Sequence, residues 1–375
     1  MSERILITGG AGFIGSHLVA ALRHESPAST IWLFDNLHPQ VHGPDAPGPA
    51  PAKQVVFRKG DVTDRSALSS IVREAQPQVV YHLAAETGTG QSQDELFRYC
   101  HVNVSGTANL IEAIRRESGT VTKQILLTGS RAVYGEGAYR DAAGTEFVGL
   151  PRNPEAMAQG DFSVPVPHDA KLPATPCPSH AGLAPNPASV YASTKLMQEY
   201  LLRQGGSGAA WRAVILRLQN VYGPGQSLRN PYTGVLTVFA RQLLSQDSLN
   251  IFEDGKIARD FVYVADVAEA LLLAKGRHLP HGTILDIGTG QPATILEVAQ
   301  RLIRLFGRTD QAFSITGQFR AGDIRHACAD PRAANRHLGW APRTDLDQGL
   351  RLFADWAKDV LGQAIPRDRR NRKSA

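Results

Sequence analysis

The feature that most constrains the fold is a glycine-rich stretch close to the N-terminus. Gly9, Gly12 and Gly15 recur every third residue. They follow an apolar run, Arg4–Thr8, and precede a helical pattern, Ser16–Arg23. In such a strand–turn–helix unit, the first glycine allows a tight turn, the second lets backbone approach a pyrophosphate, and the third lets helix pack on strand. Because free N–H groups at the start of the helix can bind phosphates, the stretch predicts a dinucleotide site.

Short apolar runs alternate with helical patterns in the segments that follow. The helical patterns include Arg65–Ala75 and Tyr99–Glu117. Strands that alternate with helices form βαβ units, whose right-handed crossovers make the sheet parallel. We therefore expect an α/β fold with a Rossmann-type, doubly wound parallel sheet, and a dinucleotide-binding domain over residues 1–218. The expected strands are Arg4–Thr8, Thr30–Phe34, Gln54–Lys59, Val79–Leu83, Gln124–Thr128 and Trp211–Leu218.

The strand pattern is interrupted by residues 141–188, which are rich in Pro, Gly and Ala and show no clear period. Because long loops are usually functional or disordered, a flap over a substrate is favoured, and a tolerated surface insertion is the alternative. After the last strand the pattern becomes mixed, with two clear helices, Ile295–Phe306 and Leu346–Val360. This predicts a smaller mixed α/β lobe over residues 219–365, some segments of which can return to the first domain.

The formal charge of +5 is concentrated in residues 366–375, a basic tail with five basic residues and one acidic residue. The remainder carries about +1, without the broad basic face that nucleic-acid binding needs, and the tail is expected to be a disordered, solvated end. No signal peptide or bilayer-spanning apolar run is present, so we expect a cytoplasmic protein with no nucleic-acid or membrane partner.

The cysteines, Cys100, Cys177 and Cys328, are too few and too far apart to imply a disulfide framework. Cys177 is followed by His180, with His168 nearby. Scattered donors without a second spaced pair make a poor zinc site, so no metal is expected.

An acidic residue, Asp35, ends the second expected strand, twenty residues beyond Gly15. A carboxylate there accepts hydrogen bonds from ribose hydroxyls and repels a 2′-phosphate, which favours NAD over NADP. The alternative is a simple strand-end turn with Asn36. After the third strand, Asp61-Val62 could contact the adenine, and after the fourth, Ala84-Ala85 leave room for the flat parts of a cofactor.

A tyrosine and a lysine, Tyr191 and Lys195, stand four residues apart and therefore share one face of a helix. Only about one phenol in a thousand is ionised at pH 7, but a nearby ammonium favours the phenolate. Lys195 can thus bind a cofactor ribose and prepare Tyr191 to take a hydroxyl proton. Ser130, at the end of the fifth strand, can hydrogen-bond the substrate hydroxyl, or else only cap a turn.

Taken together, these residues resemble the extended short-chain dehydrogenase/reductase family, in particular its nucleotide-sugar epimerases and dehydratases. The resemblance covers Arg4 to about Trp356, and includes the stretches 82–85, 103–107, 220–225 and 259–264. It implies that Tyr191 is the catalytic acid/base, with Lys195 and Ser130 as its partners. The cofactor contacts that it implies are Gly9, Gly12, Phe13, Ile14, Gly15, Asp35, Asn36, Asp61, Val62, Leu83, Ala84, Ala85, Asn103, Tyr191 and Lys195.

The resemblance also implies a nucleotide-sugar substrate. Asn220 and Arg259 would hold the diphosphate, and an arginine suits phosphate oxygens because it can donate two parallel hydrogen bonds. Arg320 and Asp323 would contact the nucleoside. The complete set of implied substrate contacts is Glu86, Thr87, Ser130, Arg131, Asn220, Arg259, Arg320 and Asp323.

The type of reaction is indicated by the two residues after Ser130. Dehydratases of the family typically have an Asp-Glu pair there and decarboxylases a glutamate, whereas this chain has Arg131 and Ala132. Elimination is disfavoured, which leaves reversible oxidation at carbon 4 and non-stereospecific re-reduction, that is, 4-epimerisation. One departure is Asp286, where relatives usually have asparagine.

The stretches 86–92, 130–139 and 226–234 look most like those of 4-epimerases that convert dTDP-L-rhamnose to dTDP-6-deoxy-L-talose for surface polysaccharide. A UDP-hexose 4-epimerase, a nucleotide-sugar 4-dehydrogenase or reductase, and a non-catalytic NAD-binding sensor stay open as alternatives. The helix of Tyr191 also carries Leu196, Tyr200 and Leu201, and relatives commonly pair through such helices, so a homodimer is expected.

Overall fold

The structure is a computed structural model that describes residues 2–169, 171–230, 232, 234–309, 312–320 and 322–364, without the side chains of 361–364. The expected basic tail, 366–375, lies outside the described residues, as do residue 365 of the expected lobe and Pro231 and Thr233 of the stretch 226–234.

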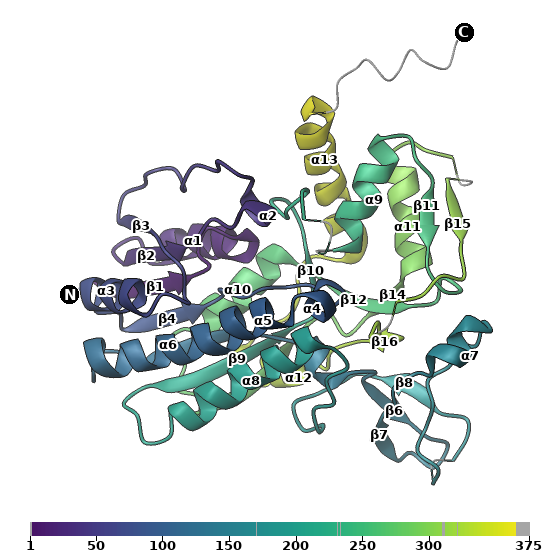
Figure 1. Ribbon diagram of the computed structural model, residues 1–375, viewed down its shortest axis with the longest axis horizontal. Helices are drawn as coiled ribbons and strands as arrows, with labels where there is room; N and C mark the ends of the chain where they lie inside the picture. Colours follow the sequence, from purple (N-terminus) through teal and green to yellow (C-terminus); the bar gives the residue numbers. More distant parts are fainter. Residues whose placement is uncertain are drawn as a thin grey trace.

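The centre of the fold is a seven-stranded parallel sheet in the order β13-β9-β5-β4-β1-β2-β3 (Figure 1). The chain order reverses beside β1, as in a doubly wound sheet, so the expected fold class is confirmed. β13 is a seventh strand that the sequence pattern did not reveal. The strands are β1 (Arg4–Thr8), β2 (Thr30–Asp35), β3 (Val55–Lys59), β4 (Val79–His82), β5 (Gln124–Ser130), β9 (Arg212–Leu218) and β13 (Thr283–Ile287).

One face of this sheet is covered by three helices, α1 (Phe13–Glu25), α10 (Val264–Ala274) and α12 (Arg332–Leu338). Ile5 and Ile7 of β1 point into the core between the sheet and these helices. Because α10, α12 and β13 all follow residue 219, this later part of the chain contributes to the core of the sheet as well as to the lobe.

The opposite face buries Leu6, the residue between those two isoleucines, because side chains alternate along a strand. Leu68 and Val72 pack into this second core from one side of α3, at the four-residue spacing of a helix face. The helices on this face are α3 (Arg65–Ala75), α6 (Gly106–Ala113) and α8 (Val190–Gly205), and turns of π-helix, Cys100–Ser105 and Ile114–Ser118, extend α6 at both ends.

The smaller lobe has its own buried core, in which three helices pack on short strands (Figure 1). Its helix α11 begins at a capping box: Thr294 accepts a hydrogen bond from the backbone of Glu297, whose side chain binds back to Thr294. The helices are α9 (Val235–Leu244), α11 (Ile295–Leu305) and α13 (Leu346–Ala364). The strands are β10 (Asn220–Tyr222), β11 (Leu249–Ile251), β12 (Ala258–Tyr263), β14 (Pro292–Thr294), β15 (Phe313–Ile315) and β16 (His326–Ala327).

The Pro-rich insert forms a small antiparallel sheet, β7-β6-β8, which stands apart from the large sheet at the lower right of Figure 1. Its elements are β6 (Ala138–Arg140), β7 (Glu146–Val148), α7 (Pro154–Ala158) and β8 (Thr175–Cys177). Within the described part of the chain, no helix is both long and apolar enough to cross a bilayer, and the cytoplasmic location stays a prediction.

Candidate active site

The carboxyl ends of the central strands open into a cleft with a volume of about 530 Å³. Its floor comes from the turns after β1, β2, β3 and β4 and from the end of β5. The opposite wall is formed by residues of the stretch 218–234. A crevice outside the carboxyl ends of parallel strands, where the strand order reverses, is where open α/β sheets bind their ligands.

The glycine turn forms the narrowest part of the floor. Gly9 has φ of +71°, and a Cβ atom added there would lie 2.6 Å from the backbone nitrogen of Ala84. A Cβ atom on Gly15 would lie 2.6 Å from the carbonyl oxygen of Gly10. Gly12 begins α1 without a side-chain cap, so the first N–H groups of the helix are left for a ligand. The turn therefore needs glycine for close backbone packing and presents backbone donors to the cleft.

Asp35 ends β2 at the edge of the cleft, where its side chain is largely buried. Its two carboxylate oxygens accept hydrogen bonds from the backbone of Ala11 (3.0 Å) and of Leu37 (2.9 Å). The same carboxylate thus orders the glycine turn and can still accept bonds from the cleft side. The strand-end turn weighed as an alternative is also present, since Asn36 accepts a bond from the His38 backbone.

Asp61 stands beside Asp35 at the next strand end and accepts a 2.8 Å hydrogen bond from Asn36 Nδ2. Burial acts to raise the pKa of Asp61, but hydrogen bonds from Thr63 and Asn36 outweigh it, and the pKa is lowered. The adjacent Val62 lines the cleft as well. This end of the cleft therefore carries two acidic side chains, and the lowered pKa of Asp61 keeps that carboxylate ionised at neutral pH.

Ser130 and Tyr191 both line the cleft at its other end, together with Arg131. Burial raises the pKa of Tyr191, while the Ser130 hydroxyl and the Arg131 guanidinium act to lower it. Ser130 also accepts a 3.2 Å hydrogen bond from the Ala132 backbone, so its turn-capping role and its place in the site coexist. The resting phenol is protonated at neutral pH, as an acid/base residue that awaits a charged ligand would be.

Lys195 lies one helical turn after Tyr191 and is 3% exposed. Its ammonium donates a 2.5 Å hydrogen bond to Gln198, and burial lowers its pKa to about 8. Gln198 in turn donates to Thr107 at 2.8 Å, and Thr107 contacts His82. Lys195 does not itself line the cleft, so it must turn away from Gln198 to reach a ribose.

Asn103 is fully buried beneath the cleft and does not line it. Its side chain accepts a 2.7 Å bond from the Glu86 backbone and donates a 2.9 Å bond to Thr194 on α8. Asn103 therefore links the loop after β4, which carries Glu86, to the helix that carries Tyr191. Glu86 and Thr87 do line the cleft. The other implied cofactor residues on the wall of the cleft are Phe13, Ile14, Leu83, Ala84 and Ala85.

A second, narrow cavity shares Arg131 with the cleft and is also lined by Arg259 and Asp323. Neither arginine forms an ion pair within the described residues, and Arg259 Nη1 binds only backbone carbonyl oxygens, the nearest 2.8 Å away on Ala258. Burial and the nearby Arg259 lower the pKa of Arg131 to about 9. Two guanidinium groups that repel one another make a site for an anion.

Arg320 is placed differently from the other implied substrate residues. Its guanidinium lies over the ring of Phe252, 4.7 Å from the ring centre, and it lines neither cavity. A cation over an aromatic face is a stabilising contact, and it holds this side chain against the lobe. The structure thus brings seven of the eight implied substrate residues to the cavities and leaves Arg320 outside them.

Two glutamines that the sequence did not suggest, Gln219 and Gln226, line the cleft beside Asn220. One buried side-chain oxygen in each of these three residues has no hydrogen-bond partner in the described chain. Buried polar atoms are normally paired, so these oxygens point to a ligand with hydrogen-bond donors. The two glutamines flank the stretch 220–225, but no motif or spacing in the sequence marks either of them.

The insert is fastened to the lobe through Arg152, which is 2% exposed. Arg152 binds Glu136 at 2.9 Å and Glu253 at 2.8 Å, and it donates to the carbonyl oxygen of Asp323 at 2.5 Å. Of the described residues from 141 to 188, only the last, Ala188, lines either cavity. The insert braces the loop that carries Asp323, and a substrate-covering flap stays a prediction.

Within the insert, Glu146 accepts a 2.7 Å hydrogen bond from His180 and lies 3.9 Å from the sulfur of Cys177. Among the described residues, no group of three or more His, Cys, Asp or Glu side chains is arranged to hold a metal ion.

Comparison with known proteins gives the family. The NAD dependent epimerase/dehydratase family matches residues 5–157 and 168–288. The chain belongs to this family. It is therefore an NAD-dependent isomerase, an epimerase of the extended short-chain dehydrogenase/reductase type.

Relatives match almost the whole length of this epimerase. It is 39% identical over 360 residues, 96% of each chain, to the dTDP-L-rhamnose 4-epimerase of Burkholderia thailandensis. The structure of UDP-glucose 4-epimerase from Thermotoga maritima, solved with UDP-glucose, is 27% identical with a TM-score of 0.76, covering 95% of this chain and 99% of that one. The Thermus thermophilus UDP-glucose 4-epimerase in complex with NAD is 28% identical with a TM-score of 0.74, and the coverage is the same.

The cleft of this epimerase fits the cofactor of its family. The glycine turn leaves space that a Cβ atom at Gly9 or Gly15 would fill, and the uncapped start of α1 supplies donors for a pyrophosphate. Asp35 lies at the edge of the cleft, and the same cleft is lined by Gln219 and Gln226, whose side-chain oxygens have no partner among the described residues. NAD is accordingly the cofactor for which these residues are arranged.

Proposed function

We propose that the enzyme is a nucleotide-sugar 4-epimerase and that its substrate is dTDP-L-rhamnose, which it interconverts with dTDP-6-deoxy-L-talose. The observation that carries the proposal is the set Ser130, Arg131 and Tyr191 at one end of the NAD cleft, with arginine and alanine following the serine. An epimerase needs one acid/base group at carbon 4, and elimination would need additional carboxylates. The 39% identity to a dTDP-L-rhamnose 4-epimerase supports the choice of hexose and nucleotide.

In the proposed mechanism, Ser130 binds the 4-hydroxyl group and Tyr191 removes its proton. The bound NAD supplies the hydride acceptor. Arg131 favours the phenolate of Tyr191. Lys195 is buried on the same face of α8, and its ammonium would favour the phenolate as well once it turns from Gln198 toward the cleft. Tyr191 then returns the proton after the sugar has turned over, so the same residues catalyse both half-reactions.

We place the substrate diphosphate between Arg131 and Arg259. Neither guanidinium group forms an ion pair with a carboxylate of the described residues, and an anion between the two groups would relieve their mutual repulsion. Asp323 lines the same narrow cavity and would accept a hydrogen bond from the nucleoside base. Strong binding at the nucleotide would leave the hexose free to rotate near Tyr191.

We also propose that the enzyme is a homodimer that pairs through α8 and its neighbour α5 (Leu96–Tyr99). Four large apolar side chains are exposed on these two helices: Leu96 (51%), Phe97 (80%), Met197 (44%) and Tyr200 (37%). Burying them against a second copy would remove apolar surface from water. Sedimentation of the wild-type chain should give a dimer and Phe97→Glu a monomer, whereas a monomeric wild type would contradict the proposal.

The decisive experiment is to incubate the enzyme with dTDP-, UDP- and GDP-sugars and to follow the configuration at carbon 4 by NMR. We expect conversion of dTDP-L-rhamnose with only catalytic NAD. A requirement for stoichiometric NAD(H) would indicate a 4-dehydrogenase or reductase, and faster conversion of UDP-hexoses would identify the other epimerase class. Absence of any turnover together with NAD binding would favour a sensor.

A further inference from the structure

Three segments that are far apart in the sequence meet at the mouth of the NAD cleft. They are α2 (Pro39–His42), α4 (Gln91–Asp94) and the loop 226–230. Each segment contains or adjoins a residue that lines the cleft. These residues are Val41 in α2, Thr89 just before α4, and Asn230 in the loop. All three segments therefore border the cleft that holds the dinucleotide.

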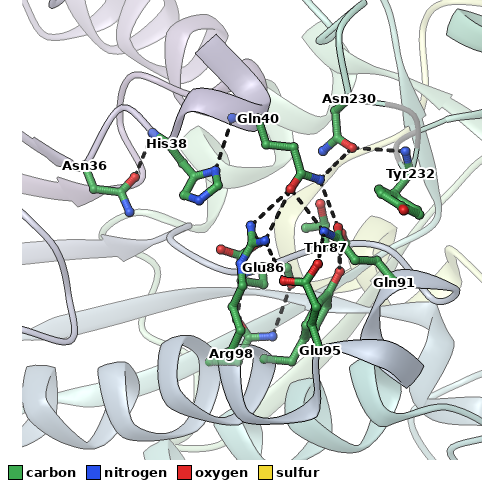
Figure 2. A network of polar contacts seen from close by, with 12 residues as sticks. Asn36, His38, Gln40, Glu86, Thr87, Gln91, Glu95, Arg98, Asn230 and Tyr232 are labelled. Atoms are coloured by element: carbon green, nitrogen blue, oxygen red, sulfur yellow. Dashed lines mark hydrogen bonds and ion pairs between the residues drawn. The ribbon is translucent and has the colours of Figure 1, made fainter. Parts of the chain in front are cut away.

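The segments are joined by side-chain amides, and the Gln40 carboxamide lies at the centre of the network (Figure 2). Gln40 and Gln91 form a reciprocal pair: Gln40 Nε2 donates to Gln91 Oε1 at 2.9 Å, and Gln91 Nε2 donates to Gln40 Oε1 at 3.1 Å. Gln40 Nε2 also donates to Asn230 Oδ1 at 3.0 Å. Gln91 and Asn230 are both 4% exposed, so these bonds are shielded from water.

Arg98 fixes the amide network to the body of the protein. Its guanidinium donates to Gln40 Oε1 at 3.3 Å from both Nη1 and Nη2, and it forms 2.8 Å ion pairs with Glu86 and Glu95 (Figure 2). Glu95 also accepts a 2.7 Å hydrogen bond from Gln91. The side of the network on α4 and α5 is therefore held rigidly, and α2 and the loop 226–230 attach to it.

A second link joins the two attached segments directly. The Ser227 hydroxyl donates a 2.9 Å hydrogen bond to the carbonyl oxygen of Val41, and both residues line the cleft. Nearby, a ring nitrogen of His17 on α1 lies 2.9 Å from the carbonyl oxygen of Pro224. Opening the mouth of the cleft therefore requires several hydrogen bonds to break together.

We propose that Gln40, Gln91 and Asn230 form an amide clasp that holds the cleft closed over NAD and slows its release. Gln40 does not line the cleft, so it acts through the segments that it joins and is a positioning residue. The inference rests on the proposed function and deepens it. An enzyme that removes a hydride and returns it to the same sugar has to keep its cofactor through both steps.

The test is the rate at which the holoenzyme releases NAD, measured without any sugar. Loss of one neutral hydrogen bond corresponds to about a 2- to 12-fold change in an equilibrium, and Gln40→Ala removes the bonds to both Gln91 and Asn230. We expect Gln40→Ala to release NAD about 10-fold faster or more, with kcat at saturating NAD within about 2-fold of wild type. Gln93→Ala is the matched control, because Gln93 lies exposed on the same helix, α4, outside the clasp.

Release at the wild-type rate from Gln40→Ala would overturn the proposal, as would an equal acceleration in Gln93→Ala. Gln40→Leu keeps the side-chain volume and serves where the alanine variant does not fold. In the wild-type chain, hydrogen exchange gives a second readout, because residues 37–43 and 226–230 should become protected together when NAD is added. Independent protection of the two segments would contradict a clasp, while a chain that binds no NAD would instead contradict the proposed function.

Discussion

The two walls of the active-site cleft are built in different ways. The cofactor wall is made by short stretches that each follow a strand, and its contacts are largely backbone: the turn Gly9–Gly15 and the bonds that hold Asp35. The substrate side gathers Arg131, Arg259 and Asp323 from distant parts of the chain. Buried charges hold it together. The cofactor wall therefore depends on local geometry, and the substrate side depends on electrostatic contacts over long sequence separations.

The largest expected effect is on the substrate side. Arg152→Ala leaves Glu136 buried without its ion-pair partner and leaves Glu253 paired with Arg325 alone, and breaking such a buried pair costs about 3–5 kcal/mol of folding stability. The control is Arg140→Ala, which breaks an ion pair of 3.4 Å with Glu146 on the surface of the same insert and should cost under about 1 kcal/mol. Denaturant unfolding measures both.

In the folded fraction of Arg152→Ala, KM for the nucleotide sugar should rise while NAD affinity stays unchanged, since Arg152 holds the carbonyl of Asp323. Equal losses in NAD and sugar binding would show that the two walls are not independent.

Tyr191→Phe tests the group between the two walls. Removing an acid/base residue typically costs about 100-fold or more in turnover, so kcat should fall by at least about 100-fold. NAD binding and KM should change little, because the ring still fills its place against Tyr99, with ring centres 6.4 Å apart. Single-turnover kinetics with a reactive nucleotide sugar gives the measurement, and near-normal turnover would remove Tyr191 from the proposed role.

The variant Asp286→Asn tests how a buried carboxyl group makes the folding stability depend on pH. Burial raises the pKa of Asp286 to about 7, above the ordinary value of 3.8. The folded chain then holds a proton that the unfolded chain releases, so this contribution to stability is present below about pH 4 and is lost as the pH rises through about 7. We expect the wild type to lose about 2 kcal/mol more than Asp286→Asn between pH 5 and pH 8.

The measurement for Asp286→Asn is denaturant unfolding across that pH range. The asparagine can keep the 2.7 Å hydrogen bond from Tyr134, so packing should be preserved. Parallel pH profiles for the variant and the wild type would contradict the assignment, and the exposed Asp45→Asn provides the baseline.

The smallest effect is expected on the cofactor wall. Asp35→Ala removes the carboxylate that would accept the ribose hydroxyls and repel a 2′-phosphate, and the preference for NAD over NADP should fall by about 10-fold. Titration of both dinucleotides against the variant measures it. KM for the sugar should not change, and an unaltered dinucleotide preference would count against the ribose contact.

Most of the central sheet could be predicted from the sequence, because strand and helix periods are local signals. Arg4–Thr8 and Arg65–Ala75 have the bounds that their patterns predict. The strand β13 was missed, because its apolar run of only five residues stands among the turns of the lobe. Its pairing with β9 is a contact over a long sequence separation, and such contacts leave no periodic trace in the sequence.

The residues of the site divide in the same way, into those that a local motif marks and those that only tertiary packing brings to the cleft. The floor of the cleft follows from motifs after strands, whereas the unpaired oxygens of Gln219 and Gln226 have no pattern that marks them. Asn103 and Arg320 carry the expected residue types, but the structure turns one into a buried link and stacks the other on Phe252. Whether a polar side chain faces a cavity depends on tertiary packing, which spacing along the chain does not contain.

The amide clasp at Gln40 implies a way in which this enzyme would lose activity over many turnovers. A closed cleft isolates the dinucleotide from the NAD and NADH of the surrounding solution. If an oxidised sugar escapes before its hydride is returned, the protein is left holding a reduced cofactor that exchanges slowly. Prolonged incubation should therefore bring a gradual, turnover-dependent loss of activity, and the same closure that makes the cofactor reusable would make each such mistake long-lived.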